Sequence, residues 1–170
     1  MPALPSSIRP IGALFAIVFT LLEGCATPVF KDMPTTTMSS PLDVAAAPER
    51  YHDAAVVWGG RVIAVHNLAD TTQVEVVAHL LDAAQRPDTS VPSIGRFVVV
   101  LPGYVESMDY PAGRWLSVRG HVGGSEVHRI DERDVVYPLL LSDDVHLWPA
   151  SFPYEHGKFT FAFGIGMGIH

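Results

Sequence analysis

The sequence predicts an all-β domain, a small and partly open antiparallel barrel similar to the OB-fold, with a β-sandwich as the alternative. Three observations support this prediction. From Ala54 onward, apolar and polar residues alternate with a period of two, and β-branched residues dominate. The first such run is interrupted by Gly59 and Gly60, where a strand can bend between sheet faces. A long irregular excursion follows the third run, as in small open barrels.

Six runs are expected to form strands, the sixth being separate or a continuation of the fifth: 55–66, 73–80, 96–101, 115–122, 135–141 and 145–148. Turn-forming residues separate them. The segment 67–72 is rich in Asn, Asp and Thr, and 82–95 is a long polar loop. The glycines at 123–124 are predicted to turn the chain after the fourth strand. The aspartates at 143–144 are predicted to form a turn before the sixth.

Composition and charge exclude several classes of partner. The 170 residues carry a formal net charge of −7, and 48% of them are hydrophobic. No cluster of lysine and arginine is present, so the chain lacks the electrostatic footprint of a nucleic-acid-binding protein. It also lacks a polybasic patch for anionic lipid headgroups. The single cysteine, Cys25, excludes an internal disulfide.

Residues 1–24 are expected to be a lipoprotein signal peptide. Arg9 precedes an apolar run at 11–22, whose 12 residues fit the apolar region of a signal peptide and are too few for a spanning helix. Leu22 stands three positions before Cys25, and a small residue directly precedes the cysteine, as at a bacterial lipoprotein processing site. Cys25 is therefore predicted to be lipidated, and this covalent lipid is the only non-protein group expected.

The residue after the cysteine is Ala26 and not aspartate, the residue associated with retention in the inner membrane. Similarity to other lipoproteins of double-membraned bacteria then implies an outer-membrane address. The lipid would attach the protein to that membrane with its domain facing the periplasm.

The rest of the chain divides into three expected parts. Residues 25–47 are rich in Pro, Thr and Ser without periodicity, which indicates a flexible tether, although a short helical turn can form within 42–51. Residues 48–150 form the barrel domain. Residues 151–170 form a Phe/Gly-rich tail, in which 159–170 alternate apolar with small residues. That stretch either docks on the barrel as a last strand or rests on the membrane or a partner.

The sequence offers little for catalysis. It has no Gly-x-Ser-x-Gly motif and no glycine-rich phosphate loop. None of its eight histidines has a recognised metal-ligand spacing. His66 and His79 flank the first hairpin and can oppose each other across it. We expect no catalytic residues, no metal site and no enzyme activity.

A ligand-binding surface is the other candidate site. Four aromatic residues can supply stacking surfaces on such a barrel: Trp58, Tyr104, Tyr110 and Trp115. Arg96 and Arg114 follow glycines beside apolar strands and can bind an anionic ligand. Alternatively, these arginines form ion pairs with Asp82, Glu75 or Asp109.

An ordered set of short motifs runs through the chain. It comprises the 22–25 processing site, Trp58-Gly59-Gly60, Val62, Asn67, Glu75-Val76, Leu81-Asp82, Arg86-Pro87, Ser93, Gly95-Arg96-Phe97, Pro102-Gly103-Tyr104-Val105, Gly113-Arg114, Val118, Gly120, Tyr137-Pro138 and Leu147-Trp148. With these motifs the chain resembles the Slp family, the starvation-inducible outer-membrane lipoproteins of gammaproteobacteria and relatives, over about residues 48–148. Glu23 departs from the family pattern, as does the charged segment 126–134, where a glycine-rich hairpin is expected.

The resemblance implies an outer-membrane lipoprotein linked to stress or stationary phase, without established catalytic residues. We therefore expect a lipid-anchored, non-catalytic protein with a structural role in the envelope under starvation or acid stress. The alternative is a binding module whose barrel face takes an envelope glycan or another ligand. An envelope protein or a glycan is the expected partner, and nucleic acid is not.

Overall fold

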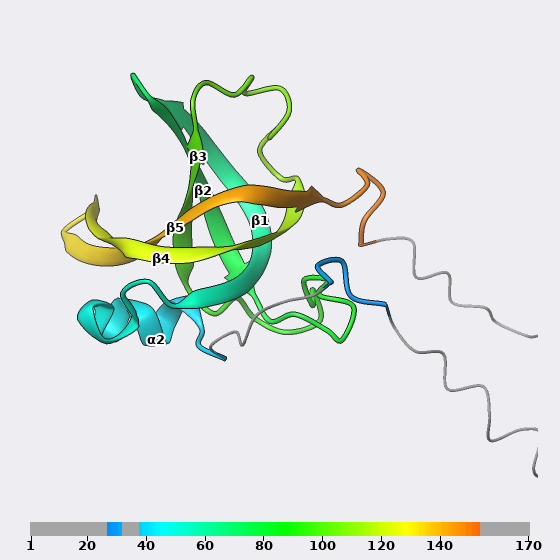
Figure 1. The fold of residues 1–170 in the computed structure, drawn as a ribbon, viewed down its shortest axis with the longest axis horizontal. Helices are drawn as coiled ribbons and strands as arrows, with labels where there is room; N and C mark the ends of the chain where they lie inside the picture. Colours follow the sequence, from blue (N-terminus) through cyan, green and yellow to red (C-terminus); the bar gives the residue numbers. More distant parts are fainter. Residues whose placement is uncertain (1–26, 32–37, 154–170) are drawn as a thin grey trace, which may run out of the picture.

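The computed structural model describes residues 27–31 and 38–153, which form a five-stranded barrel with short helical segments before the first strand (Figure 1). In chain order the elements are α2 (Pro41–Ala46), η2 (Pro48–Tyr51), β1 (Ala55–Asn67), β2 (Thr71–His79), β3 (Arg96–Pro102), β4 (Trp115–Ile130) and β5 (Arg133–Leu147). Among these residues, no helix has the length and apolar character that crossing a membrane requires.

The strands close into a ring in the order β1-β2-β3-β5-β4, with β4 pairing back to β1. This arrangement confirms the predicted all-β, OB-fold-like barrel, because all five strands belong to one ring and not to two facing sheets. One pairing differs from the antiparallel expectation. β3 and β5 run parallel over a short joint, from Val98 opposite Leu139 to Val100 opposite Leu141. Alternation alone cannot reveal strand direction, so this joint was not visible in the sequence.

The last two strands are much longer than predicted. The glycines at 123–124 lie inside β4, where the register with β5 shifts, so they mark a bulge and not the predicted turn. The chain turns instead at 131–132, where Asp131 has a φ of 54°. The predicted fifth and sixth strands are one continuous strand, because the aspartates at 143–144 lie within β5. The charged segment 126–134 is the tip of this hairpin (Figure 1).

The glycines of β1 serve close packing. A Cβ on Gly60 would lie 1.9 Å from the carbonyl oxygen of Val77 on β2, so only glycine lets these backbones approach. The register shift of β1 falls between Val62 and Ala64, just beyond the glycines. The predicted bend is therefore present in this strand, displaced by a few residues.

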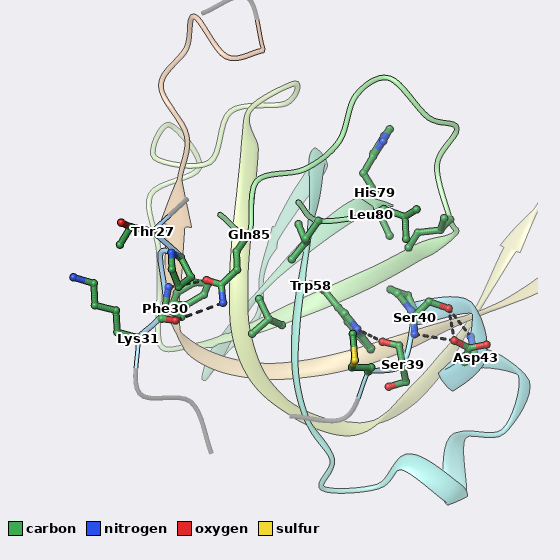
Figure 2. Close-up of a pocket in the computed structure, with 17 residues that line it drawn as sticks. Thr27, Phe30, Lys31, Ser39, Ser40, Asp43, Trp58, His79, Leu80 and Gln85 are labelled. Carbon is green, nitrogen blue, oxygen red and sulfur yellow. Dashed lines mark hydrogen bonds between the residues drawn. The ribbon is translucent and has the colours of Figure 1, made fainter. Parts of the chain in front are cut away.

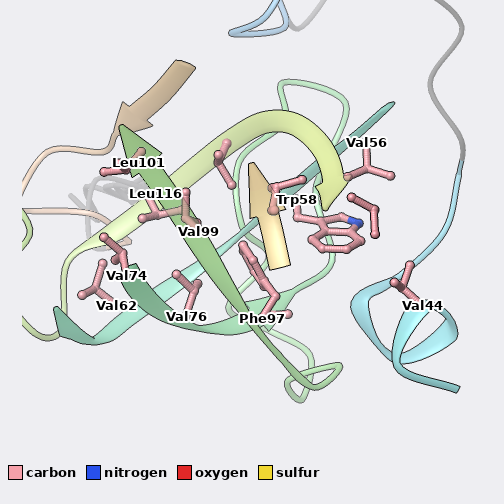
Figure 3. Close-up of a cluster of buried hydrophobic side chains, with 14 residues drawn as sticks. Val44, Val56, Trp58, Val62, Val74, Val76, Phe97, Val99, Leu101 and Leu116 are labelled. Carbon is pink, nitrogen blue, oxygen red and sulfur yellow. The ribbon is translucent and has the colours of Figure 1, made fainter. Parts of the chain in front are cut away.

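The core fills the barrel with aliphatic side chains and two aromatic rings (Figure 3). Alternate residues of β2 are completely buried, as a period of two requires: Val74, Val76 and Ala78. The indole of Trp58 meets the ring of Phe97 edge-on at 5.2 Å. Val44 of α2, also completely buried, joins this cluster.

The predicted flexible tether is wrong for residues 38–47, because this stretch folds against the barrel. Ser40 caps α2: the Asp43 N–H donates to Ser40 Oγ at 3.2 Å, and the Ser40 N–H donates to Asp43 Oδ2 at 2.9 Å. Pro41 occupies the first turn, where a missing N–H costs nothing. Burial of Val44 then fixes the helix on the core. The signal peptide, Cys25 and the tail from residue 154 lie outside the described residues, so the predictions for them stay predictions.

Candidate functional site

The main concave feature is a groove of about 1000 Å³ beside the barrel (Figure 2). The N-terminal segments 27–31 and 38–43 contribute one part of its lining, and the ends of β1 and β2 with the loop 80–94 contribute the rest. Most side chains along it are apolar: Pro28, Phe30, Met38, Pro41, Val57, Trp58, Ala78, Leu80, Leu81 and Ile94. Its volume lies at the upper end of the range for ligand sites, roughly 300–1,000 Å³.

Phe30 fixes the N-terminal segment onto the barrel. Its side chain is buried, and its backbone N–H donates to Oε1 of Gln85 at 2.7 Å. The guanidinium of Arg119 on β4 lies 5.6 Å from the centre of the Phe30 ring, within cation–π range. Arg119 also pairs with Asp144 on β5. The segment that follows Cys25 therefore has fixed contacts on two sides.

A tight polar turn holds Gln85 in place. The carboxylate of Asp82 accepts hydrogen bonds from the backbone N–H groups of Ala84 and Arg86 and from Nε of Arg86. Burial raises the pKa of Asp82, but these hydrogen bonds and the Arg86 charge outweigh it and bring the pKa below its usual 3.8. Within this turn Gln85 adopts a φ of 63° and directs its amide to Phe30.

Ser117 connects this turn to the end of the last strand. Its hydroxyl donates to the carbonyl oxygen of Gln85 at 2.5 Å and accepts from the indole N–H of Trp148 at 2.9 Å. Ser117 is completely buried, so each of these bonds replaces one to water. The hydrogen bonds thus run from Phe30 through Gln85 and Ser117 to Trp148.

An aromatic cluster holds the C-terminal end of the described chain. The ring of Phe152 stacks on Trp148 at 5.5 Å and meets Trp115 edge-on at 5.8 Å. The ring of His79, at the end of β2, meets the ring of Trp115 edge-on, with 5.0 Å between their centres. Because His79 also lines the groove, the cluster and the groove are neighbours.

The four aromatic residues predicted to stack on a ligand do not share one surface. Trp58 is buried in the core, and its indole N–H donates to the carbonyl of Ser39 at 2.7 Å. Tyr104 is 67% exposed, and its hydroxyl donates to Glu106. Tyr110 packs against the core, and burial raises the pKa of its hydroxyl, with a smaller contribution from Asp109. The ring of Trp115 lies in the aromatic cluster described above.

The two arginines have different partners. Arg96 donates to Glu75 at 3.0 Å and to the hydroxyl of Tyr137 at 3.1 Å, so the predicted alternative of an ion pair holds for it. Arg114 donates to the backbone carbonyl of Trp148 at 3.4 Å. These hydrogen bonds link each side chain to another part of the barrel. Binding of an anionic ligand to either stays a prediction.

The histidines within the described residues do not form a cluster. Register places His66 opposite Gln73 and His79 opposite Gly59, so the two histidines do not oppose each other across the hairpin, which was one alternative left open by the sequence. Across residues 27–31 and 38–153, no three His, Cys, Asp or Glu side chains stand close enough to hold a metal ion.

Sequence reasoning missed the residues that hold the segment 27–31 on the barrel, an attachment called the N-terminal dock from here on. Phe30 carried a usable signal, since it is the only aromatic residue in a Pro- and Thr-rich segment. Gln85 gave none, because its backbone conformation depends on the Asp82 turn. Ser117 sits at a polar position of an alternating run, which predicts exposure, yet it is buried beneath the loop that carries Gln85.

A family model described as the outer membrane lipoprotein Slp family matches residues 22–164. An uncharacterized protein of Haemophilus influenzae is 27% identical over 137 residues, covering 79% of this chain and 74% of that protein. An uncharacterized lipoprotein of Escherichia coli, YeaY, is 29% identical over 116 residues, covering 67% of this chain and 60% of that protein. The match thus spans less than two thirds of the Escherichia coli relative.

A single-stranded DNA-binding protein from Streptomyces coelicolor superposes with a TM-score of 0.34 and 10% identity, covering 56% of this chain and 94% of that one. At that TM-score the likeness says nothing about function.

Proposed function

Because the chain belongs to the outer membrane lipoprotein Slp family, we propose that its β-barrel is a non-catalytic envelope domain held against the membrane by a lipid on Cys25. In this proposal the domain faces the periplasm and serves a structural role under stress, such as starvation or acid. The family resemblance supports the link to stress, and the leader sequence supports the lipid.

The observation that carries this proposal is the docking of Phe30 on the barrel. Phe30 is five residues from Cys25, a stretch that spans at most about 18 Å when fully extended. A lipid on Cys25 would therefore hold the barrel within one domain's width of the bilayer. A structural role fits such a short connection, because the orientation of the domain to the membrane is restricted.

The paired charges on the barrel surface support a non-catalytic domain. Arg86 pairs with Asp82, Arg96 with Glu75, and Arg119 with Asp144. These pairs join neighbouring strands or close a turn, and each therefore has a structural explanation. None needs a substrate to account for it.

The second candidate function is a binding module, and the groove favours it. The groove walls are mostly apolar, whereas glycan sites combine aromatic platforms with polar groups that hydrogen-bond to hydroxyls. An apolar ligand therefore suits the groove better than an envelope glycan.

The test compares the full chain with its Cys25→Ala variant in cells fed a labelled fatty acid, followed by membrane fractionation. Ala26→Ser is the matched control, since it alters the adjacent residue and leaves the cysteine. The wild type and the control should carry label in the outer-membrane fraction, and Cys25→Ala should lose both label and location. A Cys25→Ala protein that stays in the outer membrane with unchanged mobility would refute the proposal.

A further inference from the structure

We propose that the groove beside the barrel holds one of the acyl chains carried by Cys25. This inference rests on the proposed function, because it requires the lipid on that cysteine. It adds a place for the lipid on the protein, so that the domain and its anchor contact each other directly.

The position of the groove is the first argument. Thr27 and Pro28 form part of its wall, and Cys25 precedes Thr27 by two residues. Two residues span at most about 7 Å. The docking of Phe30 keeps this wall against the barrel, so an acyl chain on Cys25 starts beside the groove mouth.

The chemistry of the walls is the second argument. Several polar groups along the groove already have partners within the protein, whereas Thr27 and Lys31, which also line it, are exposed. Asp43 accepts from Ser40, His79 Nδ1 lies 3.1 Å from the carbonyl of Asp88, and the Trp58 indole N–H donates to Ser39. The surface left for a ligand is the apolar remainder of the walls, and a hydrocarbon chain needs no hydrogen bonds.

Ser39 is a buried polar side chain of the groove that departs from this description. Within the described part of the chain, its buried hydroxyl has no hydrogen-bond partner. That atom is closed off from solvent, so a ligand in the groove does not reach it. The apolar character of the accessible wall is therefore unchanged (Figure 2).

Exposed apolar surface is the third argument. Met38 is fully exposed at the groove and Leu80 is 51% exposed. Contiguous apolar surface of this kind usually marks a place where a partner or a lipid binds. Covering it with the acyl chain takes the wall out of water, while the chain exchanges the bilayer interior for an apolar groove.

Two other segments of the chain compete for the groove, and the sequence favours neither. Residues 32–37 comprise one aspartate, one proline, one methionine and three threonines, which match an apolar groove poorly. The Phe/Gly alternation begins at Phe159, six residues beyond Pro153. The lipid starts closer to the groove in sequence than this tail does. Bacterial lipoprotein cysteines usually carry three acyl chains, and the two chains left in the bilayer still suffice for stable anchoring.

The test uses a fatty acid with a photoactivatable diazirine, fed to cells that express the full chain. Intact cells are irradiated, the protein is purified, and peptides joined to the Cys25 lipid are identified by mass spectrometry. We expect these crosslinks at 57–58 and 80–85. Leu80→Glu should reduce their yield at least about threefold, since a charge in the wall opposes the acyl chain. Val127→Glu, at an exposed site on β4, is the matched control and should leave the yield unchanged.

The other outcomes separate a failure of the proposed function from a failure of this inference. Absence of label on Cys25 refutes the proposed function itself. Label on Cys25 without crosslinks in the groove overturns this inference alone. Crosslinks in the groove from phospholipid, and not from the Cys25 lipid, also overturn it. A groove that becomes crosslinked only after residues 154–170 are deleted would show that the tail occupies it.

Discussion

The side-chain oxygen of Gln85 accepts a hydrogen bond from the backbone N–H of Phe30 at 2.7 Å, across 55 residues of sequence. The bond joins the segment beside the predicted lipidation site to a loop of the barrel. The carbonyl of the same glutamine accepts from Ser117, which in turn binds Trp148. The stability of the N-terminal dock is therefore coupled to the buried end of the barrel, and mutations on either side can test this.

Replacing Gln85 with alanine should release the N-terminal segment while the barrel stays folded. A side-chain hydrogen bond of this kind contributes about 1 kcal/mol, so urea unfolding should show a loss of that size. Hydrogen exchange at residues 27–31 should rise. Gln73→Ala is the control, because it removes a weaker hydrogen bond to Glu126 on the barrel surface. Unchanged protection of residues 27–31 from hydrogen exchange in Gln85→Ala would show that this bond does not hold the segment on the barrel.

Replacing Ser117 with alanine should cost considerably more. The variant removes a partner from the indole N–H of Trp148 and from the carbonyl of Gln85, and the Ser117 side chain that supplies it is completely buried. Leaving buried polar groups without a partner costs about 1–3 kcal/mol each, so a loss of about 2–4 kcal/mol is expected. Ser125→Ala, on an exposed part of β4, should stay within about 0.5 kcal/mol of wild type. Equal stabilities of the two variants would count against the network.

Replacing Gly60 with alanine should destabilise the barrel strongly. The new Cβ would lie 1.9 Å from the carbonyl oxygen of Val77, so β1 and β2 must separate. Overpacking typically costs about 1–3 kcal/mol, and a clash with backbone at this distance is expected at the upper end of that range. Gly103→Ala is the matched comparison. Its φ of 70° disfavours alanine by about 1–2 kcal/mol, but nothing lies within 4 Å of the added carbon. The midpoint temperature of thermal unfolding of Gly60→Ala should be well below that of Gly103→Ala, and the reverse order would refute the packing argument.

The sequence predicted the barrel because alternation records which strand face is buried. Val74, Val76 and Ala78 follow that rule, and so β2 was placed within two residues of its observed bounds. The direction of β5 beside β3 depends on the chain path and leaves no trace in the periodicity. Glycine was ambiguous for a similar reason, since the same residue permits a turn or a bulge. The pair at 123–124 forms the bulge.

The dock and the groove were harder to predict than the barrel. They depend on contacts between residues far apart in sequence, such as Phe30 with Gln85 and Arg119. Low hydrophobicity indicated a tether over 25–47, yet two buried residues, Pro41 and Val44, and one capping box suffice to fold 38–47 onto the core. Composition averages over a segment, whereas docking depends on single side chains.

The cap of α2 predicts a dependence of stability on pH. Hydrogen bonds from the side chain and backbone of Ser40 hold the pKa of Asp43 below its usual 3.8. A carboxyl whose pKa is lowered by folding stabilises the folded state fully above its unfolded pKa. That contribution is lost as the pH falls through the lowered value.

Asp43→Asn keeps the shape of the side chain and removes its titration. The difference in unfolding free energy between wild type and Asp43→Asn should therefore be largest above about pH 5 and should shrink as the pH falls below 3.8. Ser40→Ala removes the hydroxyl donor, so an NMR titration of Asp43 in that variant should give a pKa closer to 3.8. A constant difference between wild type and Asp43→Asn through the acid range would show that the cap does not couple to pH. An unchanged titration in Ser40→Ala would show that the hydroxyl is not its cause.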